Sequence, residues 1–383
     1  MSKSSDFRTK CVHAGELKDT QYGGAISPLY ASTSYAFNDV EINQYPRYFN
    51  TPNQRGLCEK VATLEGAESG LIFSSGMAAI STALLSHLKP GDHVIFQDDL
   101  YGGTRNLVEA QFDRFNIDYT FTDDIDLKCF KSGIKKNTKV IYIETPSNPL
   151  LKIIDIEKIA QFAKSRDIIT IIDNTFATPI IQKPILFGVD VVLHSATKYF
   201  GGHSDISAGA VAASQNHIDK IWNLAKNLGG NLSDYSVWLL ERSMKTLSIR
   251  VKAQQKNAKK LAKYLSESRY VKKVYYPGLK NHPNHNLAKK QMKGYGAMIS
   301  FEFIDKIDPS LFLTSLNLIK PSMSLAGVES TMLSPAETSH YLLTENERLS
   351  QGITNELIRF SVGIENKKDI IMDIEHAIKL AIK

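Results

Sequence analysis

The chain has 383 residues, of which 43% are hydrophobic and 22% are charged, as in ordinary globular proteins. Its 46 Lys and Arg and 40 Asp and Glu give a formal net charge of +6 at pH 7, and both signs are interspersed along most of the chain, which predicts a solvated surface and no nucleic-acid partner. The three cysteines, Cys11, Cys58 and Cys129, have no metal-ligand spacing and exclude a disulfide framework, so we expect a reducing compartment and no metal.

The N-terminal residues 1–10 are polar and lack the apolar centre of a signal peptide. No uninterrupted apolar run approaches the length of a membrane span. We therefore expect a cytoplasmic protein without a membrane partner. The chain length predicts two or three structural units, which we place at residues 1–54, 55–244 and 245–383.

Residues 1–54 contain few helix or strand signals but are rich in aromatic side chains. Because this aromatic content is too high for disorder, we predict an arm that is ordered by contact with a neighbouring subunit. Within it, Tyr45 and Arg47 present a hydroxyl and a guanidinium two residues apart, as a phosphate clamp does. Taken alone, the same pair is more typical of two ordinary surface residues.

A helix is predicted from Gln54 to Glu65, followed by a short apolar run, Leu71 to Phe73. This run meets a Ser-Ser-Gly segment that passes directly into an Ala-rich helix. Unpaired backbone N–H groups and the positive end of the helix dipole then lie at Ser75 to Met77, with Gly76 between them. This segment predicts a site for an anion, although the motif is weak by itself.

The middle of the chain alternates between strand and helix patterns. We expect strands at 93–96, 139–144, 168–172, 189–193 and 208–213, and helices at 103–115 and 156–165. This alternation predicts an α/β fold with a mainly parallel sheet that is covered on both faces.

Three of these predicted strands end in runs of polar residues, at 144–149, 173–175 and 195–198. Because the carboxyl ends of parallel strands meet at one edge of a sheet, these runs predict a ligand site there. Lys198 stands at the end of a buried apolar strand and is flanked by the hydroxyls of Ser195 and Thr197. We interpret it as an amine nucleophile that holds pyridoxal 5'-phosphate (PLP) as a Schiff base.

Two alternatives for Lys198 remain open from these residues. A solvated loop lysine would show the same local pattern. The Ser-x-x-Lys spacing from Ser195 to Lys198 is also that of serine acyl-transfer enzymes, but neither companion motif is complete, since Ile206 follows Ser204-Asp205 and Leu247 follows Lys245-Thr246.

After about residue 245 the pattern changes to a long helix at 249–266, strands at 271–276, 296–303 and 359–362, and a final helix at 369–382. We predict a smaller α+β domain packed beside the large one.

Taken together, the motifs of the chain resemble those of the trans-sulfuration family of PLP-dependent enzymes, which comprises cystathionine γ-synthase, cystathionine γ- and β-lyases and methionine γ-lyase. The resemblance rests on segments 74–79, 98–104, 144–149, 173–175, 195–203, 324–330 and 359–361, which occur in the family's order. It implies fold type I, the aspartate aminotransferase-like architecture, and a homotetramer built from two dimers whose active sites are shared across subunits.

The resemblance also implies a role for each matching residue. Lys198 and Tyr101 would be catalytic, with Lys198 as the Schiff-base lysine and proton carrier and Tyr101 stacked on the cofactor ring. The cofactor would contact Tyr101, Ser75, Gly76, Met77, Asp173, Thr175, Ser195, Thr197 and Lys198 of one subunit and Tyr45 and Arg47 of its neighbour, with Asp173 paired to the pyridine nitrogen. The substrate would be held by Asn148, Ser324, Glu329 and Arg359.

The resemblance implies elimination or γ-replacement on a sulfur amino acid, most like that of cystathionine γ-lyase or γ-synthase, with a β-lyase as the alternative. Val328-Glu329 follows the γ-lyase and γ-synthase pattern, and Gly102-Gly103 lacks the cysteine typical of methionine γ-lyase. Segments 45–52 and 334–337 depart from the family pattern where the far end of the substrate is expected. These departures leave the exact substrate open. A serine acyl-transfer enzyme and a non-catalytic scaffold are the hypotheses from other classes.

Overall fold

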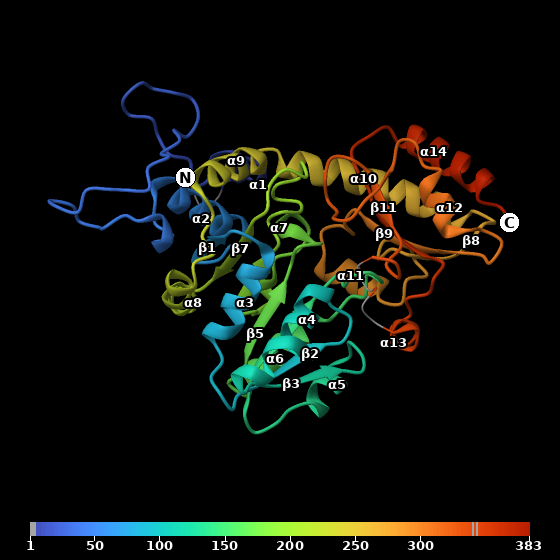
Figure 1. Ribbon diagram of the computed structural model, residues 1–383, viewed down its shortest axis with the longest axis horizontal. Helices are drawn as coiled ribbons and strands as arrows, with labels where there is room; N and C mark the ends of the chain where they lie inside the picture. The colour runs from blue at the N-terminus through green and yellow to red at the C-terminus, as the bar shows by residue number, and fades with distance from the viewer. Residues whose placement is uncertain (1–4, 339–340, 342–343) are drawn as a thin grey trace.

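The computed structural model describes residues 5–338, 341 and 344–383, and two sheets organise the chain (Figure 1). The larger sheet has the order β1-β7-β6-β5-β4-β2-β3. Its strands are β1 (Ser69–Phe73), β2 (His93–Gln97), β3 (Asp118–Thr122), β4 (Thr138–Glu144), β5 (Ile169–Asp173), β6 (Val191–His194) and β7 (Gly209–Ala213). β7 runs antiparallel to its neighbours β1 and β6, whereas the pairs from β6 to β3 are parallel, which confirms the predicted mainly parallel sheet.

The sheet is buried on both faces because its central strands are apolar at successive positions. On one face, Val140 and Tyr142 of β4 pack with side chains of α3, α4 and α8. On the other face, Ile141 and Ile143 pack with α6 and with Phe130 of α5. The helices of this part of the chain are α1 (Phe7–His13), α2 (Pro52–Glu65), α3 (Gly76–Ser86), α4 (Gly102–Gln111), α5 (Leu127–Ser132), α6 (Ile156–Lys164), α7 (Thr178–Ile181), α8 (Gln215–Leu228) and α9 (Asp234–Met244). Three 3-10 turns join them, η1 (Pro46–Tyr48), η2 (Asp113–Phe115) and η3 (Pro184–Phe187).

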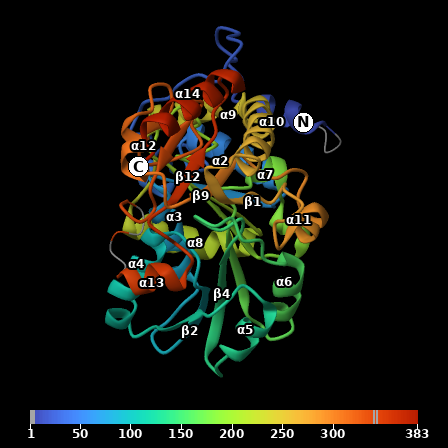
Figure 2. The same cartoon turned by 90° about the vertical axis from the view of Figure 1, so that its right-hand side faces the viewer.

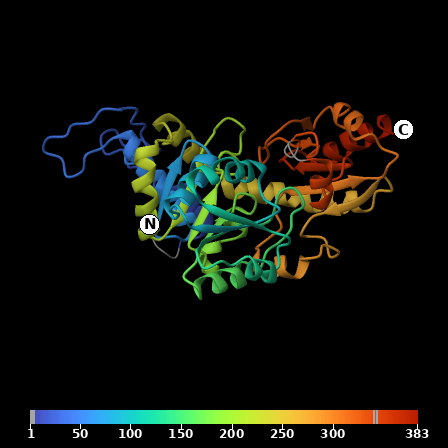
Figure 3. The same ribbon diagram turned by 60° about the horizontal axis from the view of Figure 1, so that its bottom comes forward.

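The smaller sheet has the order β10-β11-β12-β9-β8 and is antiparallel except for the pair β10–β11. It is built from β8 (Val271–Tyr275), β9 (Met298–Phe303), β10 (Lys320–Pro321), β11 (Thr331–Leu333) and β12 (Leu357–Ser361). Its helices are α11 (His285–Gln291), α12 (Pro309–Thr314), α13 (Glu345–Ser350) and α14 (Lys367–Leu380). The long helix α10 (Leu247–Ser266) runs from the large sheet to this smaller unit (Figures 1 and 3). The predicted combination of a large α/β unit and a smaller α+β unit is confirmed.

Most predicted elements lie within a few residues of the observed ones. The helix predicted from Gln54 begins two residues earlier, at Pro52, because the Thr51 hydroxyl and the Gln54 side chain form a capping box. The sequence did not predict β3, since this edge strand is only partly buried and lacks an apolar run. It also missed α8, although Ile218, Ile221 and Ala225 recur at helical spacing and are buried.

Between α1, which packs against α2 through the buried Cys11, and the start of α2, the N-terminal arm extends away from the rest of the chain as long loops (Figure 1). Four of its aromatic side chains are exposed, Tyr22 at 83%, Phe37 at 78%, Tyr30 at 45% and Tyr45 at 44% of full exposure, whereas Phe49 is buried. Apolar side chains exposed together mark an interaction surface in a folded protein. That a neighbouring subunit covers this arm stays a prediction.

Residues at the carboxyl ends of the large sheet and residues of the smaller unit line one cavity, and Figure 2 views the chain from the side on which the smaller unit lies. At this edge, Gly209 at the start of β7 lies against the backbone of Ser75, which precedes α3. A Cβ atom at position 209 would overlap the Ser75 carbonyl oxygen and lie 3.0 Å from the Ala79 Cβ. The absence of a side chain at 209 therefore fixes how closely the start of α3 approaches the sheet.

Gly209→Ala should lower the thermal melting temperature by roughly 2.5 °C or more, because backbone overlap in a packed region costs at least about 2 kcal/mol. Gly133→Ala is the matched control: its Cβ would lie 3.4 Å from the nearest side-chain atom, Cδ1 of Ile95, which is ordinary contact. Equal melting temperatures for the two variants would contradict this account of the α3 position.

Candidate active site

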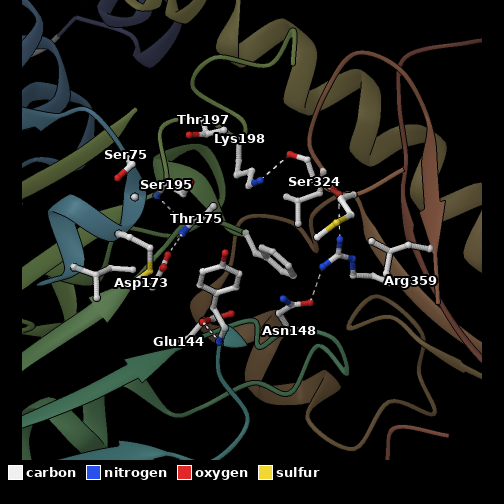
Figure 4. Close-up of a pocket in the computed structure, with 18 residues that line it drawn as sticks. Ser75, Glu144, Asn148, Asp173, Thr175, Ser195, Thr197, Lys198, Ser324 and Arg359 are labelled. Atoms are coloured by element: carbon white, nitrogen blue, oxygen red, sulfur yellow. Dashed lines mark hydrogen bonds between the residues drawn. The ribbon is translucent and has the colours of Figure 1, made fainter. Parts of the chain in front are cut away.

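A cavity of about 290 Å³ lies where the carboxyl ends of the large sheet meet the smaller sheet (Figure 4). Eighteen residues line it, and twelve of them are residues proposed from the sequence. These twelve are Ser75, Gly76, Met77, Tyr101, Asn148, Asp173, Thr175, Ser195, Thr197, Lys198, Ser324 and Arg359. Segments that are as much as 284 positions apart in the chain thus contribute to one cavity.

One end of the cavity is formed by the N-terminus of α3. Ser75 is the N-cap residue, and its hydroxyl oxygen accepts the backbone N–H of Ala78 at 3.1 Å. The first N–H groups of a helix have no partner within the helix, so those of Gly76 and Met77 are available to an anion. A Cβ at Gly76 would lie 2.8 Å from the Ser195 Cβ, so only glycine keeps this space open between helix and strand end.

Lys198 follows β6 in the turn that closes onto the cavity. Its Nζ donates to the hydroxyl oxygen of Ser324 at 2.6 Å (Figure 4). Burial, and secondarily the positive charge of Arg359, lowers the pKa of this amine to about 8. A larger fraction of the amine is therefore neutral near physiological pH than for an ordinary lysine.

Asp173 ends β5 and is 6% exposed. Its Oδ1 accepts the backbone N–H of Thr175 at 2.9 Å, while the Thr175 hydroxyl oxygen accepts the N–H of Ser195 at 2.8 Å. Burial raises the pKa of the Asp173 carboxyl, because its charged form has lost most of its contact with water. The Thr197 hydroxyl has a different kind of partner from that of Thr175: it donates to the backbone carbonyl oxygen of Ala208 at 3.1 Å.

At the opposite end of the cavity, Arg359 of β12 is 6% exposed. It donates to the side-chain oxygen of Asn148 at 3.1 Å and to the backbone oxygen of Ser324 at 3.0 Å. Burial lowers the pKa of the guanidinium to about 10, which still leaves it charged near neutral pH. Ser324 has a φ of 78°, in the left-handed region that non-glycine residues rarely adopt, so its position is set by strained backbone.

Tyr101 stands at the N-terminus of α4 and lines the cavity. Its backbone N–H donates to Oε2 of Glu144 at 2.9 Å. A Cβ at Gly103 would overlap the Tyr101 ring, so the glycine provides the surface on which the ring rests. The Gly102-Gly103 pair seen in the sequence therefore has a steric function.

Three residues proposed from the sequence lie outside the lining of this cavity: Tyr45, Arg47 and Glu329. Tyr45 is 44% exposed, and Arg47 donates to the backbone oxygen of Lys226 at 2.5 Å. Glu329 is half-buried, and a Cβ on Gly327 would lie 2.7 Å from its Oε2.

The sequence analysis did not assign the remaining six lining residues, Ile80, Glu144, Phe176, Met323, Leu325 and Leu333. Five of them are apolar and form the walls. Glu144 belongs to one of the strand-end polar runs, but nothing in the sequence shows which of those polar side chains faces the cavity.

Among the described residues, no group of three or more His, Cys, Asp or Glu has the arrangement of a metal site, and no helix is long and apolar enough to cross a membrane.

The fold is that of the fold-type-I PLP-dependent enzymes, as the sequence predicted. The sequence profile described as "Cys/Met metabolism PLP-dependent enzyme" matches residues 8–379. The chain belongs to this family of PLP-dependent enzymes.

Individual relatives match over nearly their whole length. A cystathionine β-lyase of Lactococcus lactis subsp. cremoris is 42% identical over 379 residues, which cover 98% of this chain and 99% of the relative. An L-methionine γ-lyase of Fusobacterium nucleatum is 41% identical, with 98% and 99% covered. The crystal structure of cystathionine γ-lyase from Lactobacillus plantarum complexed with L-serine superposes with a TM-score of 0.95 at 40% identity, covering 98% of this chain and 99% of that one.

The residues around the cavity fit the family's cofactor. The space beside Gly76 at the start of α3 suits a phosphate group, Lys198 offers an amine for an aldehyde, and the buried carboxyl of Asp173 offers an acceptor for a protonated ring nitrogen. The Nζ of Lys198 bonds to Ser324 and not to Ser195, which disfavours the serine acyl-transfer alternative.

In the cofactor-free protein, the rate at which Lys198 is modified by an amine reagent should rise tenfold per pH unit and level off near pH 8. Ordinary exposed lysines should continue to gain reactivity up to about pH 10. Arg359→Met removes the neighbouring charge and should move the Lys198 plateau to higher pH. Peptide mass spectrometry after brief labelling at each pH measures both effects, and a Lys198 profile that matches the exposed lysines would refute the assignment.

Proposed function

We propose that the chain catalyses elimination from cystathionine, or γ-replacement on an O-acylhomoserine, with cystathionine γ-lyase or γ-synthase as its nearest functional counterparts. The family match over residues 8–379 carries this proposal, supported by the half-buried amine of Lys198 and the buried guanidinium of Arg359, which line one cavity and both hydrogen-bond to Ser324. A cystathionine β-lyase is the second candidate, because such an enzyme is 42% identical to this chain.

Arg359 is positioned to bind the α-carboxylate of an amino acid by paired N–H donors. Its two recorded hydrogen bonds, to Asn148 and to the backbone of Ser324, hold the guanidinium plane in place before substrate arrives. We assign Asn148 and Ser324 to the same carboxylate-binding group. An anchored carboxylate places the Cα proton of the substrate toward the Lys198 side of the cavity.

When bound, PLP supplies an electron sink conjugated to the substrate Cα. Lys198 takes the proton from Cα and returns one to the leaving sulfur or oxygen, because a pKa near 8 allows its Nζ both to accept and to donate at neutral pH. The hydroxyl of Ser324 directs Nζ during these transfers. The apolar walls, which include Phe176 and Leu325, exclude water from the path.

Asp173 would face the ring nitrogen and keep it protonated, and Tyr101 would cover the ring. The amides of Gly76 and Met77, together with Ser75, Ser195 and Thr197, would hold the phosphate. Thr175 supports Asp173 and Ser195 through its backbone and hydroxyl bonds. We place Glu329 near the far amine of the substrate.

We further propose a homotetramer formed by two dimers, in the cytoplasm. The arm of residues 1–54 would cross to a neighbouring subunit and bring Tyr45 and Arg47 to its phosphate site, while residues 55–244 and 245–383 form the two domains of each subunit. The exposure of Tyr45 and of the arm aromatics supports this arrangement.

The purified protein should take up PLP and absorb visible light, and borohydride should leave a pyridoxyl group covalently attached to Lys198. Lys198→Ala should show neither attachment nor turnover, whereas Lys183→Ala, at a half-buried lysine outside the cavity, should retain both.

The products formed from cystathionine identify the reaction: 2-oxobutyrate with cysteine for γ-elimination, pyruvate with homocysteine for β-elimination. Cystathionine formed from an O-acylhomoserine and cysteine would identify a synthase, and no product from any of these would overturn the proposal.

Mixing inactive Arg47→Ala and Lys198→Ala subunits should restore activity to about a quarter of the sites, since half of randomly formed dimers are mixed and each has one intact site. The matched control mixes Asp173→Asn with Lys198→Ala. Both of these defects lie in the same subunit's cavity, so exchange should restore nothing. If the first mixture also remains inactive after verified exchange, Arg47 does not serve a neighbour's site.

A further inference from the structure

Two buried carboxyl groups end adjacent strands at the edge of the cavity. Glu144 is the last residue of β4 and Asp173 the last of β5, and the two are paired in register across the parallel strands. Paired residues of neighbouring strands project to the same side of a sheet. Glu144 is 5% exposed and Asp173 6%, and both line the cavity.

Glu144 has a backbone partner but no recorded cation partner. Its Oε2 accepts the N–H of Tyr101 at 2.9 Å, and within residues 5–338, 341 and 344–383 no ion pair of Glu144 is recorded. The nearest buried cation of the cavity, Arg359, directs its donors to Asn148 and Ser324. A fully charged Glu144 would therefore be a second buried anion beside Asp173.

Adjacent buried carboxyls do not both ionise, because each negative charge raises the cost of the other. The protonated pyridine nitrogen would be a cation beside Asp173. Its charge would make Asp173 the ionised carboxyl of the Glu144–Asp173 pair. The proton then remains on Glu144. Consistent with this, burial and the charge of Asp173 raise the pKa of Glu144 well above its ordinary range.

We propose that Glu144 is a positioning residue that works as a neutral carboxyl group, holding the Tyr101 backbone while leaving Asp173 as the single anion under the cofactor ring. This inference rests on the proposed pairing of Asp173 with the ring nitrogen. It explains why a carboxyl, and not an apolar group, stands at the end of β4: an acceptor is needed for the N–H at the start of α4, but a second charge is not tolerated.

Other titratable groups face Glu144 from the surrounding elements: Asp99 after β2, Tyr101 at α4, Tyr142 within β4 and Arg359 of β12. Burial raises the pKa of Asp99 to about 6, opposed by Lys152 and by the hydroxyl of Ser147. Asp99 is thus ionised at pH 8. A protonated-carboxyl signal at pH 8 that is lost in Glu144→Gln and kept in Asp99→Asn is therefore assigned to Glu144.

The direct test is infrared difference spectroscopy of the PLP-loaded protein at pH 8. Wild type minus Glu144→Gln should show the C=O stretching band of a protonated carboxyl, which glutamine removes while retaining an oxygen acceptor for Tyr101. Wild type minus Asp99→Asn, the matched buried control, should show no such band. Absence of the band in the first difference spectrum overturns the inference.

Visible circular dichroism of the bound cofactor tests the positioning of Tyr101. Glu144→Ala, which lacks the acceptor, should reduce the signal at least about twofold more than Glu144→Gln does, because the Tyr101 backbone loses its hydrogen bond only in the alanine variant. Equal signals for the two variants overturn the positioning role. A wild-type protein that takes up no PLP would instead refute the proposed function itself, so the two failures are distinguishable.

The pH dependence of unfolding provides a readout in the cofactor-free protein. Between the ordinary glutamate value of 4.5 and its raised folded pKa, the folded state holds a proton that the unfolded state has released. Wild-type stability should therefore fall with rising pH relative to Glu144→Gln, by up to about tenfold in the folding constant per pH unit. Parallel profiles of the two proteins from pH 5 to 8 overturn the inference, whereas a growing gap supports it.

Discussion

The structure depends on keeping charged groups out of water without leaving them unbalanced. A lysine amine and an arginine guanidinium both hydrogen-bond to Ser324 in one cavity, and two carboxyl groups at strand ends also line it. Each charged form is disfavoured by burial, and each is therefore sensitive to its neighbours. The proposed catalysis through Lys198 depends on this burial, because an amine in open water would remain protonated and could not accept a proton near neutral pH.

The sheet topology provides this arrangement. Strands β4, β5 and β6 are parallel, so their carboxyl ends bring Glu144, Asp173 and the turn at Lys198 to the same edge. The antiparallel strand β7 then places Gly209 against the segment that starts α3, which directs the helix N-terminus at the same space. The smaller sheet closes the other side through β12, where Arg359 is buried. Neither sheet alone forms the cavity.

Much of this arrangement could be predicted from the sequence. Alternating apolar strands and amphipathic helices indicated the α/β sheet, and polar runs at three strand ends indicated which edge carries the site. The lysine after a buried strand indicated amine chemistry. The predicted sheet and the gathering of these residues at one cavity are confirmed, because they depend on local periodicity and on a general rule of parallel sheets, whereas the chemistry of Lys198 stays a prediction.

The rest depends on contacts between distant segments. The register that pairs Glu144 with Asp173 cannot be obtained from either strand separately, so Glu144 remained one polar residue among several. The edge strand β3 lacks the apolar run by which the central strands were recognised. Tyr45, Arg47 and Glu329 lie outside the cavity of a single chain, and their assignments come from resemblance to the family.

The contact between Tyr101 and Gly103 also limits which residues can occupy position 103. The ring occupies the volume that a side chain at 103 would need, so the first turn of α4 presents bare backbone to the aromatic face. Any larger residue there would have to displace the ring, and Tyr101 is one of the residues that line the cavity. The shape of the cavity wall thus depends in part on the absence of a methyl group at a position outside the lining.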